Sequence, residues 1–148
     1  MPQEIDILVS EVGPRDGLQS IKRIMDTQDK LNWIKALAAS GIQEIEVGSF
    51  VSPRLLPQMA DCAKLVSETN KIDNLMVLAL VPNLKGAELA VAAGARKLTI
   101  PPSASHAHSI KNIGKTPAEA IEEVHRICKF RDNLPEKQRP DIEVGISP

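Results

Sequence analysis

The sequence predicts an α/β protein in which strands and helices alternate along one domain. Short runs rich in β-branched and aliphatic residues alternate with segments of helical periodicity throughout the 148 residues, the pattern of repeated βα units. The run 75–81 is continuously apolar, which is typical of a parallel strand covered on both faces. Hydrophobic residues make up 43% of the chain but include only 2 Phe, 1 Trp and 0 Tyr. Such an aliphatic composition suits a parallel sheet covered by helices.

The expected strands end close to turns or polar loops, and they cover residues 5–12, 43–49, 75–81, 97–101 and 141–147. The first helix is expected to begin at Thr27, because apolar residues then recur at helical spacing until Gly41. A glycine there suits the left-handed turn that ends many helices. Two further helices are expected near 56–69 and 84–93, the second ending at Gly94.

The last helix has the clearest beginning. Thr116, Pro117 and Glu119 supply a capping hydroxyl, a proline at the first helical position and a carboxylate three residues after the cap. Apolar spacing predicts which side chains face the core: Leu31, Ile34 and Leu37 in the first helix, Met59, Cys62, Leu65 and Val66 in the second, and Ile121, Val124, Ile127 and Cys128 in the last.

Two architectures share this order of elements: an open, doubly wound sheet and part of an eight-stranded barrel. Local patterns do not separate them. Neither G-x-G-x-x-G nor G-x-x-x-x-G-K-[ST] follows the first strand, which weakens the nucleotide-binding version of the open sheet.

Charge and composition exclude several classes of function. A formal net charge of -1 and few aromatic residues argue against a nucleic-acid partner. No apolar run approaches the roughly 20 residues of a membrane span, and the first residues resemble neither a signal nor a transit peptide. We therefore expect a cytoplasmic protein without a membrane partner. Cys62 and Cys128 fit no C-x-x-C spacing and are expected to be reduced and structural.

Polar residues collect where the expected strands end, the edge at which both architectures place their active sites. After the first strand, Arg15 and Asp16 follow a Gly-Pro turn. They offer a guanidinium that can hold a developing oxyanion and an oxygen ligand for a hard cation. The alternative is an ordinary surface ion pair or a helix cap.

In the second strand, Glu44 and Glu46 point to the same side of the sheet. Buried carboxylates need a partner or a chemical role, and a structural salt bridge between Glu46 and Arg15 is the alternative to a catalytic one. Three further cations could meet an anionic group or could be ordinary surface charges: Arg54, Lys85 and Lys111. The helix that opens at 82–86 could likewise bind an anion at its N-terminus or simply be capped by Asn83.

Several stretches resemble the hydroxymethylglutaryl-CoA lyase family, in order and at familiar spacings: EVGPRDGLQ, EIEVGSFVSP, LLPQMAD, VPNLKG and KNI. The resemblance covers nearly all of the chain. EVGPRDGLQ and SFVSP together are highly specific, whereas either alone is only suggestive.

The resemblance implies the N-terminal half of a TIM (β/α)8 barrel, with about four βα units and a fifth strand. It implies a lyase of leucine degradation that cleaves 3-hydroxy-3-methylglutaryl-CoA to acetoacetate and acetyl-CoA with Mg²⁺ or Mn²⁺. Asp16 matches the metal-ligating aspartate, Arg15 the arginine that steadies the enolate, and Glu46 a catalytic glutamate near metal and substrate. Gln19 and Lys22 match the loop beside the substrate.

The family's other functional groups come from the second half of the barrel: a His-x-His metal pair, a metal-binding asparagine and a mobile cysteine loop. A complete barrel typically needs about 250 residues. His106 and His108 have the spacing of the metal pair, but they follow the fourth strand and match a different loop, so we do not expect them to bind metal. His125 lies among charged residues and is expected to be solvated.

Five strands cannot close a barrel packed by eight, so inward apolar side chains would be left uncovered. Leaving about 400 Å² of such surface wet would cost on the order of 10 kcal/mol. We therefore expect either that a longer chain completes the barrel or that two copies form a homodimer.

Two other functions remain open from the sequence. A related Claisen-type synthase or aldolase is the enzymatic alternative, although those enzymes tend to carry Arg-Asp-Gly-Glu-Gln where this chain has Gly17, Leu18 and Gln19 after its Arg-Asp. The other is a non-catalytic half-barrel that only self-associates.

Overall fold

A computed structural model describes residues 7–148 and contains one parallel sheet of five strands in the order β1-β2-β3-β4-β5. The strands are β1 (Ser10–Glu11), β2 (Glu44–Ser49), β3 (Met76–Leu80), β4 (Lys97–Ile100) and β5 (Asp141–Val144). Each strand pairs with the next one in the sequence. An open doubly wound sheet reverses its strand order at a switch point, whereas consecutive order is that of a barrel. The topology thus decides between the two architectures that the sequence left open.

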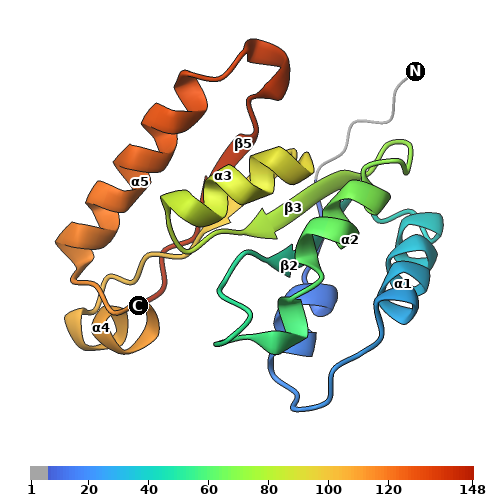
Figure 1. The fold of residues 1–148 in the computed structure, drawn as a ribbon, viewed down its shortest axis with the longest axis horizontal. Helices are drawn as coiled ribbons and strands as arrows, with labels where there is room; N and C mark the ends of the chain where they lie inside the picture. Colours follow the sequence, from blue (N-terminus) through green and yellow to red (C-terminus); the bar gives the residue numbers. More distant parts are fainter. Residues whose placement is uncertain (1–6) are drawn as a thin grey trace.

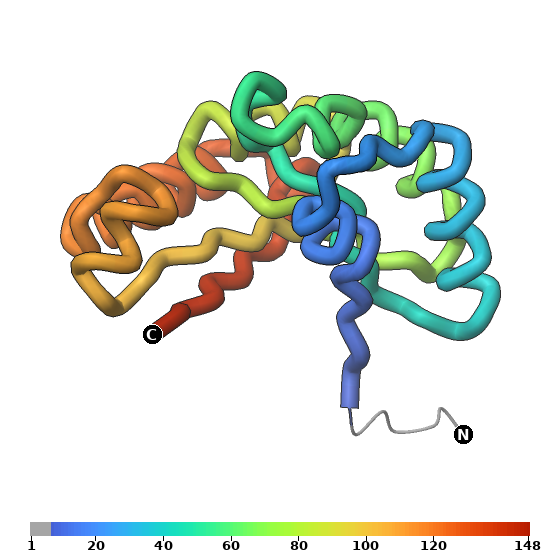
Figure 2. The backbone as a smooth tube through the Cα atoms, turned by 90° about the horizontal axis from the view of Figure 1, so that it is seen from below, coloured from blue at the N-terminus to red at the C-terminus, as the bar shows by residue number. Residues whose placement is uncertain are grey.

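The helices form a layer outside the sheet. They are α1 (Thr27–Ala39), α2 (Cys62–Thr69), α3 (Leu84–Ala93), α4 (His106–Ile113) and α5 (Pro117–Asp132), with short helical turns η1 (Gly13–Gly17), η2 (Pro57–Met59) and η3 (Glu136–Gln138). In Figure 2 the helices form an outer arc around the strands, and the C-terminus lies on the open side of this arc. Within the described residues, no helix is both long enough and apolar enough to cross a membrane.

The hydrophobic core lies between the helices and the outer face of the sheet. Side chains from the middle of three strands are fully buried there: Ile45, Val47, Val77, Ala79 and Leu98. β2 and α2 approach so closely that a Cβ at Gly48 would lie 2.6 Å from the Cys62 Sγ. Burial raises the pKa of the Cys62 thiol, and both cysteines are free. These findings agree with a structural role for Cys62.

The inner face of the sheet is more polar than the sequence predicted. Lys97 Nζ lies 3.1 Å from Glu44 Oε2 and 2.7 Å from Glu143 Oε2, so three strands are joined by ion pairs. Burial alone would lower the pKa of Lys97, but the two carboxylates outweigh it and raise the pKa. Some exposed apolar side chains flank the two edge strands: Ile7, Leu8 and Val9 precede β1, Val144 ends β5, and Ile146 follows it.

Most expected elements are confirmed with shorter bounds. The first strand was expected over 5–12, but β1 is only Ser10–Glu11, because residues 7–9 and 12 are described outside the strand; residues 5 and 6 lie outside the described residues. The fifth strand ends at Val144, and Ser147 forms only an isolated bridge with Ser103. The expected helix 56–69 is divided into η2 and α2. α1 ends two residues before Gly41, whose φ of 98° confirms the left-handed turn.

Two expectations about helices were wrong. Residues 106–113 were assigned to a loop, but they form α4, capped by the Ser105 side chain. Ile121 was expected in the core, but it is 56% exposed, and α5 instead buries Ala120, Glu123 and Ile127. The buried stripe therefore includes a carboxylate that a purely apolar pattern passes over.

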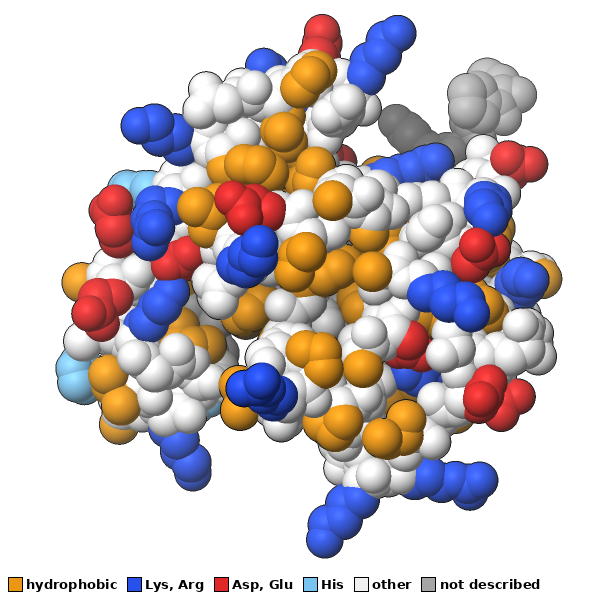
Figure 3. Space-filling view, viewed as in Figure 1, with side chains coloured by type: hydrophobic (Ala, Val, Ile, Leu, Met, Phe, Trp, Pro, Cys, Tyr) orange, Lys and Arg blue, Asp and Glu red, His pale blue; other side chains and the backbone are white. Residues whose placement is uncertain are grey.

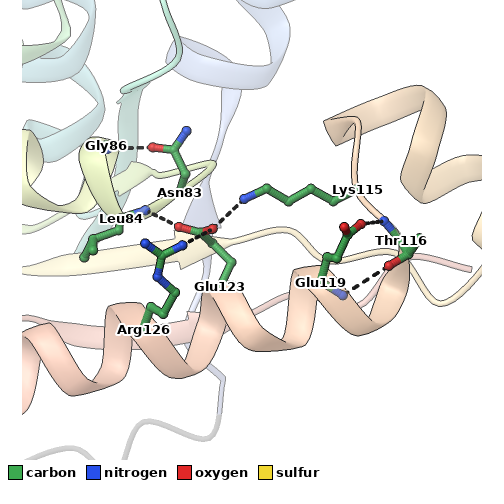
Figure 4. Close-up of polar contacts among 8 residues, drawn as sticks. All are labelled: Asn83, Leu84, Gly86, Lys115, Thr116, Glu119, Glu123 and Arg126. Carbon is green, nitrogen blue, oxygen red and sulfur yellow. Dashed lines mark hydrogen bonds and ion pairs between the residues drawn. The ribbon is translucent and has the colours of Figure 1, made fainter.

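Glu123 links α5 to the start of α3 and to the loop before α5 through hydrogen bonds (Figure 4). Its Oε1 accepts a hydrogen bond from the Leu84 backbone N–H at 2.7 Å, and its Oε2 accepts one from Lys115 Nζ. Leu84 is the first residue of α3, and Asn83 caps α3 by accepting a hydrogen bond from the Gly86 N–H. The anionic group at the N-terminus of α3 is therefore the protein's own carboxylate. Thr116 and Glu119 form the expected capping box.

Glu123→Gln is expected to lower the free energy of unfolding at pH 7 by about 2 kcal/mol, because it weakens two hydrogen bonds to a buried charge. Burial opposes ionisation of Glu123, but Lys115 and the Leu84 N–H overcome it and hold its pKa below the ordinary value. The stabilisation is therefore present at neutral pH and lost as the pH falls through the folded-state pKa.

Urea unfolding from pH 7 to pH 3 would measure this difference. It should stay constant down to about pH 5 and shrink below about pH 4. Glu122→Gln, at an exposed neighbouring position, should change stability by less than about 0.5 kcal/mol. Equal losses in the two variants would contradict the assigned role of Glu123.

Candidate active site

The first two strands bring Arg15 and Glu46 together at the carboxyl edge of the sheet. Arg15 Nε donates to Glu46 Oε2 at 2.6 Å, and Arg15 Nη1 donates to Asp16 Oδ1 at 2.9 Å. The side chain of Arg15 is 16% exposed and that of Glu46 only 2%, whereas Asp16 is 62% exposed. The salt bridge weighed in the sequence is thus present, and it leaves Asp16 at the open rim.

The turn η1 explains why neighbouring residues point in different directions. The Gly13 N–H donates to Glu11 Oε1 at 2.6 Å, and the Asp16 N–H donates to the Val12 carbonyl at 2.7 Å. Pro14 is buried at the start of this turn. The tight backbone directs Arg15 toward the sheet interior and Asp16 toward the solvent.

The environment of Glu46 favours its protonated form more than water does. Burial raises the pKa of its carboxyl, and the neighbouring Arg15 guanidinium lowers it without cancelling the rise. A carboxyl group whose pKa is raised by desolvation can exchange a proton closer to neutral pH. Burial and the Arg15 charge thus oppose each other at Glu46, and burial has the larger effect.

Three buried polar atoms on β2 and β4 have no hydrogen-bond partner: Glu46 Oε1, Ser49 Oγ and Thr99 Oγ1. Thr99 is close enough to Glu46 to help lower its pKa, although the two groups lack good hydrogen-bond geometry. Ser49 and Thr99 align with Leu80 in one row of the sheet. Buried polar groups are normally satisfied by protein or water, so these atoms offer contacts to a polar ligand.

Sequence reasoning missed Ser49 and Thr99 as site residues. Ser49 belongs to the SFVSP stretch, which could have singled it out. Thr99 gave no local signal, because its relation to Glu46 depends on pairing between strands distant in the sequence.

Gln19 and Lys22 lie on the exposed segment that follows η1. This segment continues to α1, which Asp26 caps by accepting from the Gln28 N–H. The described hydrogen bonds link neither Gln19 nor Lys22 to the Arg15–Glu46 pair. Their expected approach to a substrate stays a prediction.

The other polar candidates lie outside the Arg15–Glu46 pair. His106 and His108 are exposed on α4, with His108 Nδ1 3.5 Å from Ser147 Oγ. His125 is exposed on α5, as expected. Lys85 lies at a largely apolar groove of about 350 Å³ between the loop after β2 and the start of α3. Figure 3 shows hydrophobic side chains gathered on this face, between α2 and α3.

The described residues do not form a complete metal site. Within residues 7–148, no group of three or more His, Cys, Asp and Glu side chains is placed to hold a metal ion. Asp16 offers an exposed carboxylate whose Oδ1 already accepts from Arg15. One carboxylate suits a hard cation but cannot enclose it.

Comparison with known proteins gives consistent matches. The HMGL-like family model matches residues 6–146. A mitochondrial hydroxymethylglutaryl-CoA lyase of Gallus gallus is 44% identical over 121 residues, which cover 82% of this chain and 40% of the relative. A 3-hydroxy-3-isohexenylglutaryl-CoA/hydroxymethylglutaryl-CoA lyase of Pseudomonas aeruginosa is 38% identical over 122 residues, again 82% of this chain and 40% of the relative.

A solved HMG-CoA lyase from Acinetobacter baumannii, in complex with coenzyme A and 3-methylmalate, superposes with a TM-score of 0.85 and 32% identity. The match covers 94% of this chain and 44% of that one. The chain therefore spans less than half the length of the relatives it matches. Its five-stranded sheet corresponds to the N-terminal part of their TIM barrel.

Proposed function

Because the chain belongs to the HMGL-like family, we propose that it supplies the first half of a metal-dependent lyase that cleaves 3-hydroxy-3-methylglutaryl-CoA to acetoacetate and acetyl-CoA. The observation that carries this proposal is the Arg15–Glu46 pair at the carboxyl edge of the sheet. A guanidinium beside a carboxyl of raised pKa joins the two functions that this cleavage needs.

Arg15 is proposed to bind the oxyanion that develops on the departing thioester. Its Nε donates to Glu46 and its Nη1 to Asp16. A guanidinium has five N–H donors in a fixed plane, so others are available for a substrate oxygen. The contacts to Glu46 and Asp16 hold the plane in one orientation before substrate arrives, which is the condition for effective electrostatic stabilisation.

Glu46 is proposed to take part in moving the proton of the substrate's tertiary hydroxyl. Breaking the carbon–carbon bond requires that this hydroxyl lose its proton. Glu46 Oε1 is buried and without a partner, so it can accept a hydrogen bond from a substrate or from a water molecule. Thr99 and Ser49 offer further hydrogen-bonding groups on the same strands.

A divalent cation is proposed to bind at the rim, with Asp16 as one ligand. Asp16 fits this role because its carboxylate is exposed beside the pair and oxygen ligands suit Mg²⁺ and Mn²⁺. When bound, the cation supplies positive charge that stabilises a deprotonated substrate oxygen. The remaining ligands would have to come from another part of a barrel.

The proposed substrate class is a 3-hydroxyacyl-CoA. The Pseudomonas aeruginosa relative is named for both an isohexenylglutaryl and a methylglutaryl substrate. The proposal therefore does not specify which group the substrate carries at its 3-position. A cytoplasmic location stays a prediction, because several relatives are named mitochondrial.

The test uses a completed barrel, in which residues 1–148 are followed by the second half-barrel of a solved relative. With Mg²⁺ it should release acetyl-CoA and acetoacetate from 3-hydroxy-3-methylglutaryl-CoA, and EDTA should abolish the release. A folded barrel that forms no acetyl-CoA, or that only condenses acyl-CoA substrates, would overturn the proposal.

The 148-residue chain by itself is expected to associate in solution. Exposed apolar side chains flank its edge strands, with Ile7, Leu8 and Val9 before β1 and Val144 and Ile146 at and after the end of β5, and burying these side chains is favourable. Light scattering of the purified chain should give a mass of at least a dimer. A dilute monomer that melts cooperatively would contradict this expectation.

A further inference from the structure

A buried lysine lies at the centre of a hydrogen-bond network beside the candidate site. Lys30 in α1 is 1% exposed, and its Nζ donates to the Gln58 carbonyl at 2.6 Å and to Asp61 Oδ1 at 2.7 Å. A buried ammonium is costly unless it is fully paired. The contacts that Gln58 and Asp61 make with the rest of the chain suggest why this lysine is buried.

The partners of Lys30 join two loops that follow neighbouring strands. Asp61 Oδ2 accepts a hydrogen bond from Thr27 Oγ1 at 2.8 Å, at the start of α1. Gln58 Nε2 donates to the Ile21 carbonyl at 2.8 Å. The segment 18–26, after η1, is thereby tied to the segment 50–61, after β2.

Besides the packing of the buried Leu18, segment 18–26 has few described contacts to distant parts of the chain. Its other described hydrogen bonds are local, such as those from the Ser20 and Ile21 N–H groups to residues three positions earlier. Among the described residues, the Gln58–Ile21 contact is the hydrogen bond that ties residues 20–25 to a distant part of the chain. Ile21 lies between Gln19 and Lys22, the two residues expected beside a substrate.

We propose that Lys30, Gln58 and Asp61 form a clamp that fixes the segment 18–26 before substrate binds, and so act as positioning residues for Gln19 and Lys22. The first part of this inference concerns the loop alone, whereas the second rests on the proposed function. Lys30 fixes the Gln58 backbone and the Asp61 side chain through its hydrogen bonds. The Gln58 side chain, held in place in this way, then fixes the backbone at Ile21.

Hydrogen–deuterium exchange tests the loop in the completed barrel. Gln58→Met removes the donor to Ile21 but leaves the buried ion pair intact, so it should fold. Amides of residues 20–26 should then exchange about tenfold faster, while β2 and β3 keep their protection. Lys30→Met should extend the acceleration to residues 55–61. Lys35→Met, the same substitution at an exposed position of α1, should change neither segment.

Kinetics test the positioning role. Gln58→Met should raise KM for the acyl-CoA about tenfold and change kcat less than about threefold, because it loosens a binding loop without touching the reacting groups. A purely structural role would lower stability without moving KM. Unchanged exchange in residues 20–26 would overturn the clamp. Accelerated exchange with unchanged KM would overturn the positioning role, and an inactive parent barrel would refute the proposed function while leaving the clamp standing.

Discussion

Arg15→Gln in the completed barrel is expected to lower kcat by about 10² to 10³ and to leave KM within about threefold. Hydrogen bonds to Glu46 and Asp16 hold the Arg15 guanidinium at the carboxyl edge of the sheet. A glutamine at this position could still form hydrogen bonds but would carry no charge. An oxyanion forms only as the carbon–carbon bond breaks, so the lost contact weakens the transition state more than the bound substrate. Steady-state kinetics at saturating Mg²⁺ measures the two constants separately.

The matched control is Arg96→Gln. Arg96 is exposed and directly precedes β4, at the amino ends of the strands and away from Arg15. Its Nη2 donates to the Asn70 carbonyl. This variant should keep kcat and KM within about twofold of the parent. If Arg15→Gln raises KM alone, Arg15 is a substrate-binding residue and its role at the oxyanion is refuted.

Glu46→Gln is expected to lower kcat by about 10² to 10⁴, the usual range for a general acid or base. The amide preserves the size of the side chain and can still accept from Arg15, but it cannot exchange a proton. Because burial raises the pKa of Glu46, the parent's activity should fall as the pH drops through a value above that of an ordinary glutamate. The pH profile of the parent and the kcat of the variant are the measurements.

Glu44→Gln provides a stringent control for this variant. Glu44 lies on the same face of β2, is equally buried and is paired with Lys97 rather than with Arg15. Its replacement should cost about 1 to 3 kcal/mol of stability while leaving kcat within about threefold. Equal losses of activity in the two variants would assign both glutamates to structure and remove Glu46 from the reaction.

The sequence predicted the fold well where local chemistry is decisive. Thr116 and Glu119 marked the start of α5, and Gly41 and Gly94 marked left-handed helix ends. Local chemistry was insufficient for α4, because its eight residues carry only Ala107, Ile110 and Ile113 as apolar positions, too short a pattern to identify a helix. It also misplaced Ile121, because Glu123 is drawn inward by groups on two other segments.

The candidate site was predicted in part. Arg15, Asp16 and Glu46 were found from their place at strand ends and from the family resemblance, and the structure brings all three together. Ser49 and Thr99 were missed, and Thr99 gave no local signal because its relation to Glu46 is set by the pairing of strands far apart in the sequence. The polar inner face has the same origin, since the three strands that carry Glu44, Lys97 and Glu143 meet only in the folded sheet.

This chain is proposed to carry the Arg15–Glu46 half of a catalytic site and to need a second half-barrel to act. The direct measurement is acetyl-CoA release from 3-hydroxy-3-methylglutaryl-CoA with Mg²⁺, using the mass-verified 148-residue chain and the completed barrel side by side. Asp16 leaves a cation short of ligands within residues 7–148, so the chain alone should give no release above background while the completed barrel turns over steadily. Steady release by the 148-residue chain at a comparable rate would contradict the claim.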